Sequence, residues 1–262
     1  MAVMDLKGKT ALITGATSHG MGRSIAFKFA TLGANVVLNY GTHDDPEYLK
    51  ESAKRAEIVA GHVNRLGGHA HIIPGNTRDE EVNKRLVEET VEKFGSLDIL
   101  VINAGGRWNT LKLEEITLER WQSCVQAELD AWFLICKHAV PVMRKQDDSR
   151  ILVMSMNGAM GRKTFENTGI DYTVAKTGRT WLSLALGIDE WDNGIRINIF
   201  EIGPMEHISI EKALAAIEKT DDVWEKRDKP WVHDAAEMAA FLVSEGGRFM
   251  STSLLRYPQD KW

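Results

Sequence analysis

Short apolar runs alternate with longer segments of helical periodicity along the whole chain. The apolar runs cover residues 10–14, 35–40, 69–74, 97–102, 151–155 and 195–201, with a weaker run at 250–256. The amphipathic segments cover residues 23–32, 47–66, 79–94, 118–143, 172–191 and 234–244. A strand buried on both faces is continuously apolar, and two parallel strands need a crossover connection between them. The alternation therefore predicts an α/β protein whose parallel sheet is covered by helices on both faces.

The chain has no Pro- or Ser-rich linker and no internal repeat, so its 262 residues predict a single domain covering 1–262. Its formal net charge of −5 argues against electrostatic binding to nucleic acid. Cys124 and Cys136 fall within one predicted helix and are expected to be free thiols in a reducing compartment. No apolar run approaches about 18 residues, and the N-terminus lacks a signal-peptide pattern. We therefore expect a soluble, cytoplasmic protein without a membrane partner.

The segment T-G-A-T-S-H-G-M-G follows the first predicted strand directly and opens the first predicted helix. Gly15, Gly20 and Gly22 permit a tight turn and a close approach of the backbone to a pyrophosphate, which the helix N-terminus also favours. A purely structural turn is the alternative. The position of the turn at the start of an alternating chain favours the dinucleotide site.

The end of the second predicted strand bears on which dinucleotide binds. An Asp or Glu there would bind the adenosine ribose diol of NAD and repel the 2′-phosphate of NADP. Asn39 and Tyr40 stand there instead, followed by Thr42. His19 in the glycine turn either helps to bind the phosphate or is a solvated loop residue. The pattern favours NADP(H) over NAD(H).

Tyr172 and Lys176 lie four residues apart at the start of a predicted helix, which places the phenol and the ammonium on one face. A free tyrosine has a pKa of about 10, and a nearby cation lowers that value toward the range useful for acid–base catalysis. Taken alone, the spacing is also compatible with two surface residues on a helix.

Four motifs occur in order: T-G-x4-G-x-G, D-I-L-V-I-N-A-G-G at 98–106, Y-x-x-x-K, and G-I-R-I-N at 194–198. Together they resemble the classical short-chain dehydrogenase/reductase (SDR) family over nearly the whole chain. The Asn-Tyr pair after the second strand resembles the NADPH-dependent ketoreductase branch. The resemblance implies a doubly wound, Rossmann-type sheet, a nicotinamide cofactor and hydride exchange between a carbonyl and an alcohol. It also implies a homo-oligomer, by family habit a tetramer built through residues 118–143 and 172–191.

The resemblance implies catalytic roles for several residues. Tyr172 would be the general acid in carbonyl reduction, and Lys176 would lower its pKa and bind the nicotinamide ribose. Matching the glycines of S-M-N-G-A-M-G makes Ser155 the catalytic serine. Counting along the strand from Arg150 instead puts Met156 at that position. We prefer Ser155, because a thioether cannot donate a hydrogen bond.

One position of the family's catalytic tetrad departs from the pattern, because Glu128 stands where the family has an asparagine. Its carboxylate either lies close to Lys176, where it would stabilise the ammonium and partly cancel its effect on Tyr172, or faces solvent as an ordinary helical residue.

The predicted binding residues come mainly from loops that follow the strands. For the cofactor they are Gly15, Ser18, His19, Gly20, Met21, Gly22, Asn39, Tyr40, Thr42, Asn76, Thr77, Asn103, Ala104, Gly105, Tyr172, Lys176, Gly203, Pro204 and Met205. For the substrate they are Trp108, Phe165, Asn167 and His207, with a substrate loop at about 206–231. No metal site is expected, because no His or carboxylate cluster has the spacing of metal ligands.

The leading interpretation is an NADPH-dependent carbonyl reductase that interconverts a ketone or aldehyde and an alcohol. One alternative is a cofactor-binding sensor or regulatory protein with little catalysis, which the change at Glu128 motivates. Another is an epimerase or dehydratase that uses hydride transfer with no net cofactor turnover.

Overall fold

The computed structural model of the 262-residue chain describes residues 4–18, 20–42, 45–106, 110–156, 169–202, 208–218 and 232–256. Some of the residues predicted for the site lie outside these ranges, namely His19, Trp108, Phe165, Asn167, Gly203, Pro204, Met205 and His207. Most of the predicted substrate loop at 206–231 also lies outside them.

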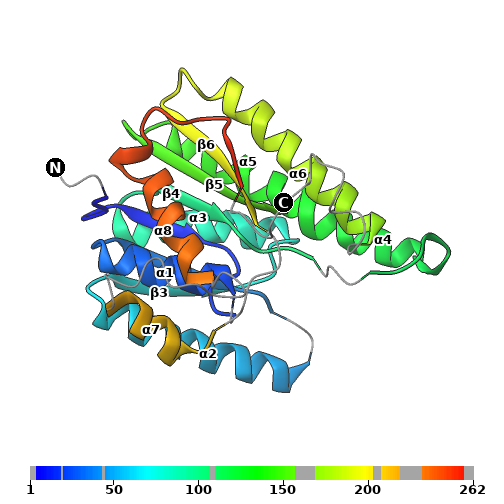
Figure 1. The fold of residues 1–262 in the computed structure, drawn as a ribbon, viewed down its shortest axis with the longest axis horizontal. Coiled ribbons are helices and arrows are strands. Elements are labelled where there is room, and N and C mark those ends of the chain that lie inside the picture. Colours follow the sequence, from blue (N-terminus) through cyan, green and yellow to red (C-terminus); the bar gives the residue numbers. More distant parts are fainter. Residues whose placement is uncertain are drawn as a thin grey trace.

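The described residues form one seven-stranded sheet with the order β3-β2-β1-β4-β5-β6-β7, and every neighbouring pair is parallel. The strands are β1 (Thr10–Ile13), β2 (Asn35–Tyr40), β3 (His69–Pro74), β4 (Ile99–Ile102), β5 (Ser149–Met156), β6 (Ile195–Ile202) and β7 (Leu254–Arg256). The chain runs outward from β1 to β3 and returns to β4 on the other side of β1 (Figure 1). The sheet is therefore doubly wound, with its topological switch point between β1 and β4. The predicted Rossmann-type α/β fold is confirmed.

Helices cover both faces of the sheet (Figure 1). They are α1 (Met21–Thr31), α2 (Pro46–Arg65), α3 (Glu80–Phe94), α4 (Leu118–Val125), α5 (Ala131–Met143), α6 (Ile170–Asp189), α7 (Ile210–Glu218) and α8 (Val232–Val243). Shorter turns are η1 (Leu113–Glu115), the π-helical η2 (Gln126–Asp130) and η4 (Glu245–Gly247). The packing of α1, α2 and α8 builds one apolar core, and that of α3 and α5 with the inner side of α6 builds the other.

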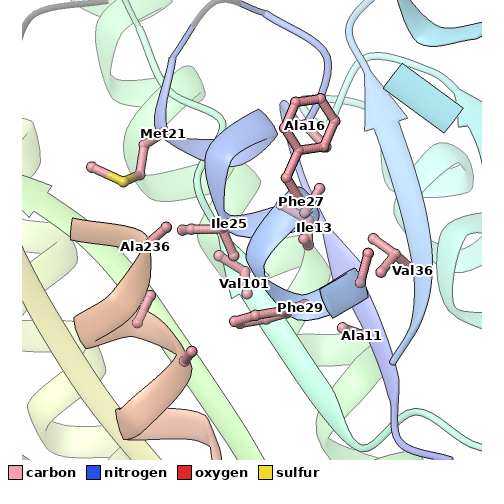
Figure 2. Close-up of a cluster of buried hydrophobic side chains, with 14 of the residues drawn as sticks. Ala11, Ile13, Ala16, Met21, Ile25, Phe27, Phe29, Val36, Val101 and Ala236 are labelled. Carbon is pink, nitrogen blue, oxygen red and sulfur yellow. The ribbon is translucent and has the colours of Figure 1, made fainter. Parts of the chain in front are cut away.

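Strand periodicity explains why the two cores are separate. In β1, Leu12 belongs to the core on the α3–α5 side and Ile13 to the core on the α1–α8 side, because successive side chains point to opposite faces. Figure 2 shows Ile25 of α1 near Val101 of the sheet and Ala236 of α8. Burial on both faces is what makes these strands continuously apolar in the sequence.

The structure adds two features to the predicted elements. The predicted helix 118–143 is helical throughout but widens at η2, where the N–H of Ala131 bonds to the carbonyl of Gln126, five residues back. Helix α7 forms inside the region predicted as a substrate loop. Elsewhere, helix starts follow local capping, as at α2, where the Asp45 side chain accepts hydrogen bonds from the N–H groups of Glu47 and Tyr48.

Two further observations concern the whole described chain. Cys124 and Cys136 are buried free thiols, as predicted. None of the helices in the described ranges is both long and apolar enough to cross a membrane.

Candidate active site

A groove of about 830 Å³ runs across the carboxyl ends of β1, β2, β3 and β4 and reaches α4 and the start of α6. Ten of the residues predicted to bind the cofactor line it: Gly15, Ser18, Asn39, Tyr40, Thr42, Asn76, Thr77, Asn103, Ala104 and Gly105. The position is the one expected for a ligand of a doubly wound sheet, because the loops diverge at the switch point.

The glycine turn is shaped by backbone conformation and by close approach. Gly15 has φ +64°, in the left-handed region that glycine adopts without strain. A Cβ on Gly22 would lie 2.6 Å from Nδ2 of Asn103 and 2.6 Å from the carbonyl oxygen of Gly15. The absence of a side chain at Gly22 therefore lets α1 begin directly against the loop that follows β4. Met21 is different, because its side chain lies in the apolar core rather than in the groove (Figure 2).

Asn103 joins the loops after β1 and β4. Its Nδ2 donates to the carbonyls of Thr14 and Gly15, each at 3.0 Å. The hydroxyl oxygen of Thr14 accepts from the backbone N–H groups of Asn103 and Ala104, also at 3.0 Å. These reciprocal bonds hold the floor of the groove in one geometry without using a charged group.

Asn39 supports the groove from below instead of reaching into it. Its side chain is buried, and its Nδ2 donates to the carbonyls of Ile73 (3.2 Å) and Gly75 (3.0 Å). Its Oδ1 accepts from the N–H of Gly15 at 3.3 Å. The amide thus ties together the ends of three strands. The geometry therefore does not favour a role for the Asn39 side chain in binding the cofactor ribose.

Three groove residues on α2 are not among those predicted from the sequence. Tyr48, Ser52 and Arg55 line the groove beside Tyr40 and Thr42. Nη2 of Arg55 donates to Oγ of Ser52 at 2.8 Å, which points the guanidinium toward this end of the groove. The i, i+4, i+7 spacing of the three residues marks one helix face and was the available signal.

Asp171 of α6 lines the opposite end of the groove, and the next turn of the helix brings Tyr172 and Lys176 together beside it. The Lys176 Nζ lies 5.5 Å from the centre of the Tyr172 ring. Burial raises the pKa of the Tyr172 phenol above its ordinary value, and the negative charge of Glu128 adds to this effect. Burial lowers the pKa of Lys176 to about 8, although the Glu128 carboxylate opposes the shift. The interpretation of the pair as two surface residues is therefore wrong.

Glu128 is also part of this cluster. Its side chain is fully buried, with Oε2 3.0 Å from Nζ of Lys176 and Oε1 accepting the N–H of Gly106 at 2.6 Å. Burial by itself would raise the pKa of this carboxyl, but the nearby Arg179 and Lys176 outweigh burial and hold it below the ordinary value. The carboxylate is charged and faces Lys176, so the alternative of a solvent-facing helical glutamate is wrong.

Ser155 is not brought to Tyr172, which corrects the preferred assignment of the catalytic serine. Its buried hydroxyl lies 2.6 Å from the hydroxyl of Thr180, eight residues beyond Tyr172 on α6. Eight residues of helix span about 12 Å. Moreover, β5 pairs with β6 in unbroken register to Met156, so counting along the strand from Arg150 meets no bulge. The strand count, which puts Met156 at the serine position, is the better match.

The wall of the groove between α4 and α6 carries a buried ion pair. Nε of Arg120 donates to Oδ2 of Asp171 at 2.8 Å, and the Asp171 side chain is almost completely buried.

Among the described residues, no group of three or more His, Cys, Asp or Glu side chains could hold a metal ion.

A doubly wound sheet with a groove at its switch point, and a Tyr–Lys pair at one end of that groove, defines a dinucleotide-dependent oxidoreductase of the SDR type. The comparisons support this class. A family model described as "Enoyl-(Acyl carrier protein) reductase" matches residues 15–256. Among curated relatives, glucose 1-dehydrogenase 2 of Bacillus subtilis (strain 168) is 29% identical over 256 residues, covering 96% of this chain and 93% of the relative.

Two other relatives are named for activities different from glucose dehydrogenation. The 3-oxoacyl-[acyl-carrier-protein] reductase of Synechocystis sp. is 31% identical and covers 74% of this chain and 72% of the relative. NADPH-dependent aldehyde reductase 1 of Arabidopsis thaliana is 30% identical and covers 76% of this chain and 66% of the relative. A solved dehydrogenase/reductase from Sinorhizobium meliloti 1021 superposes with a TM-score of 0.81 at 28% identity, covering 97% of this chain and 95% of that one.

The chain belongs to the classical short-chain dehydrogenase/reductase family, and it is an oxidoreductase of that family. The family binds NAD(P), and the groove fits such a cofactor. The fit rests on the position of the groove across the switch point, lined by Gly15, Thr17 and Ser18, and on the N-terminus of α1, where Gly20 supplies no side-chain cap.

Proposed function

We propose that this chain is an NADP(H)-dependent carbonyl reductase, in which Tyr172 is the general acid. The observation that carries the proposal is the contact of the half-buried Tyr172 with the buried Lys176, whose partner Glu128 binds the N–H of Gly106 in the groove wall. When bound, the cofactor would supply a hydride to the carbonyl carbon of the substrate.

The protein groups would manage the proton in this reaction. The raised pKa of the Tyr172 phenol keeps it protonated at neutral pH, so that it can donate to the carbonyl oxygen as negative charge develops there. The Lys176 ammonium, held beside the ring, would stabilise the phenolate left behind. Because a protonated phenol is the acid form, this environment favours carbonyl reduction over alcohol oxidation at neutral pH.

The test of this chemistry is Tyr172→Phe in a panel of carbonyls, with consumption of NADPH followed by its absorbance. The names of the relatives suggest sugar lactones, aldehydes and 3-oxoacyl thioesters as panel members. General acid–base groups contribute about 10²- to 10⁴-fold, so we expect a loss of that size with NADPH affinity unchanged within about twofold. Thr177→Ala on the same helix is the matched control. A Phe variant as active as the wild type would refute the role of Tyr172.

The preference for NADP(H) is supported by charge at the α2 end of the groove. Neither Asn39 nor Tyr40 at the end of β2 carries a charge that would repel a 2′-phosphate. The guanidinium of Arg55 lines the groove beside them and supplies a cation that suits a phosphate. The aldehyde reductase relative from Arabidopsis thaliana is named as NADPH-dependent.

The substitution Arg55→Gln should affect the binding of NADPH and of NADH differently. Hydrogen bonds to charged groups contribute about 1.5–3 kcal/mol, so the variant should weaken NADPH binding by about tenfold or more and leave NADH binding unchanged. Lys54→Gln, an exposed neighbour on α2, is the matched control and should change neither. Equal effects on NADPH and NADH would contradict the assignment of Arg55 to the 2′-phosphate.

A second candidate is a cofactor-binding protein with little turnover. The hydroxyl of Ser155 is committed to Thr180, and Met156 has a thioether that cannot donate a hydrogen bond to a substrate oxygen. Tight NADPH binding combined with no turnover across the whole panel would favour this candidate. Interconversion of substrate without NADPH consumption would instead indicate an epimerase or dehydratase.

We further propose a homo-oligomer, by family analogy a tetramer. Apolar side chains are exposed along α4–α5 and α6: Leu118, Trp121, Phe133, Val174, Trp181, Leu182 and Ile188. An exposed apolar surface of this kind is typical of subunit contacts. Light scattering should show that Trp181→Glu dissociates the assembly, whereas Ile58→Glu on α2 does not.

The two buried free thiols fit a reducing compartment such as the cytoplasm.

A further inference from the structure

The fully buried guanidinium of Arg179 lies where four segments meet. It contacts one carboxylate and four backbone carbonyls. Nη2 lies 3.1 Å from Oε2 of Glu128 and donates to the carbonyls of Ala104 (2.8 Å) and Ala127 (3.3 Å); Nε donates to the carbonyl of Glu128 (3.0 Å), and Nη1 to that of Met154 (3.4 Å). These partners come from the loop after β4, from β5 and from η2.

The π-helical turn η2 supplies two of the four carbonyls that Arg179 binds. In η2 a hydrogen bond spans five residues instead of four, which locally disturbs the ladder of the long helix. The carbonyls of Ala127 and Glu128 in this turn accept from Arg179, so the guanidinium joins α6 to the turn. A guanidinium suits this position because its planar fork offers several donors in fixed directions.

The same guanidinium decides how the charge of Glu128 is shared. Oε2 of Glu128 lies 3.0 Å from Nζ of Lys176 and 3.1 Å from Nη2 of Arg179, so one carboxylate oxygen faces two cations. Oε1 is bound by the N–H of Gly106, and a Cβ on Gly105 would lie 2.6 Å from it. The cluster of Glu128, Lys176 and Arg179 therefore holds one negative and two positive charges.

We propose that Arg179 is a positioning residue of the active site. Its guanidinium holds the Glu128 carboxylate and the 104–106 loop in place, so that the negative charge of Glu128 is shared between Arg179 and Lys176 and does not neutralise Lys176 alone. The inference rests on the proposed function, because it concerns the Tyr–Lys pair of that reaction. It assigns to this chain a cation that compensates for the carboxylate at the position where the family has an asparagine.

The surroundings of Tyr172 agree with this role. Among the described residues, the charged or titratable groups that influence the phenol are Glu128 and Cys124 from the helix packed on it and Arg179 from its own helix, beside Lys176. Burial raises the pKa of the Cys124 thiol to about 11, so this group is neutral near pH 7. Removing the positive charge of Arg179 leaves the phenolate less stabilised, which moves the pKa of Tyr172 upward.

The experiment compares Arg179→Met, Arg179→Lys, Glu128→Gln and the double variant Glu128→Gln/Arg179→Met with the wild type. The first readout is the pH dependence of kcat/KM for alcohol oxidation, which requires the deprotonated phenol. Arg179→Met should shift the rising limb upward by about one pH unit, a tenfold loss at a fixed pH on that limb. Arg179→Lys keeps the charge and should leave the limb in place, while its lost contacts to the 104–106 loop weaken NADPH binding.

The second readout is the thermal midpoint, which needs no activity. Arg179→Met leaves the buried Glu128 with one cation fewer, and the double variant removes both opposite charges. The double variant should therefore be more stable than the sum of the two single changes predicts. If Arg179→Met does not fold, we expect the double variant to fold, because it leaves no carboxylate buried without Arg179, and it then carries the kinetic comparison with Glu128→Gln.

The outcomes separate this inference from the proposed function. An unshifted limb in Arg179→Met, or additive thermal midpoints, overturns the role of Arg179 even if the wild type is a carbonyl reductase. A wild type that turns over nothing in the panel overturns the proposed function, and the thermal cycle then decides alone whether Arg179 and Glu128 are coupled. A loss of stability with an unchanged pH profile identifies Arg179 as purely structural.

Discussion

The two ends of the cofactor groove are built from different chemistry. Beside β1 and β2, neutral groups hold the loops: Asn39, Asn103 and Thr14 exchange hydrogen bonds with backbone atoms of three strand ends. Beside α6, the buried charges of Glu128 and its two cationic neighbours, Lys176 and Arg179, hold the 104–106 loop. Neutral bonds fix geometry independently of pH, whereas buried charges fix geometry and also tune proton transfer.

The energetic consequences of the two designs differ. Burying an amide requires only that its hydrogen bonds be satisfied, as they are at Asn39. Burying a carboxylate requires a compensating charge, and removing one partner leaves the other uncompensated. The charged end should therefore be more sensitive to single substitutions and to acid than the neutral end.

Glu128→Gln should have the largest effect on stability. Breaking a buried ion pair costs about 3–5 kcal/mol, because the remaining charges of Lys176 and Arg179 are left without their anion. Urea unfolding at neutral pH measures this loss. Asp130→Asn, an exposed carboxylate in the same π-helical turn, is the control and should cost less than about 0.5 kcal/mol. A loss of under about 1 kcal/mol for Glu128→Gln would contradict the contrast between the two ends.

Asn39→Ala should have the next largest effect. It leaves the N–H of Gly15 and the carbonyls of Ile73 and Gly75 without their partner, and we expect a cost of about 2–3 kcal/mol. The cost should stay constant between about pH 5 and pH 9, because no titrating group is involved. Asn35→Ala, at the other end of β2, loses one 3.3 Å bond to Thr10 and should cost less. A cost for Asn39→Ala that varies with pH would refute the neutral description of this end.

Ser155→Ala tests the corrected assignment of this residue. Loss of the hydrogen bond to Thr180 should cost about 1–2 kcal/mol in unfolding free energy, with kcat within about threefold of wild type. Thr90→Val, a buried hydroxyl on α3, should behave similarly. A decrease in kcat of more than about a hundredfold would return Ser155 to the catalytic group.

Acid should remove the difference in unfolding free energy between the wild type and Glu128→Gln. The pKa of Glu128 is lower in the folded state than in the unfolded chain, so its contribution is present above the unfolded value of about 4.3 and is lost as the pH falls through the folded value. The slope of this loss is at most about 1.4 kcal/mol per pH unit. Urea unfolding of both proteins between about pH 7 and pH 3 should show the two curves converging. Parallel curves would mean that the pKa of Glu128 is the same in the folded and unfolded states, which contradicts a carboxylate held charged by its two cations.

Several elements followed from the sequence because their signals are local. The continuous apolar run at 35–40 and the helix that follows Asp45 coincide with β2 and α2 to within one or two residues. The π-helical turn and α7 did not follow. A π turn is not marked by the apolar period of the surrounding helix, and α7 lies in a region where the resemblance implied a loop.

The site shows the same division between local and long-range information. The sequence by itself determined the parallel α/β sheet, the glycine turn and the pairing of Tyr172 with Lys176, because hydrophobic period, glycine conformation and i,i+4 spacing act within one segment. Only the tertiary structure decided that Glu128 and Arg179 are buried partners, since they are brought together from η2 and α6, 51 residues apart. Tertiary packing also decided that Ser155 faces Thr180 and that Arg55 faces the groove. A polar residue's partner depends on which elements pack against it, and a single sequence does not encode that packing in any local pattern.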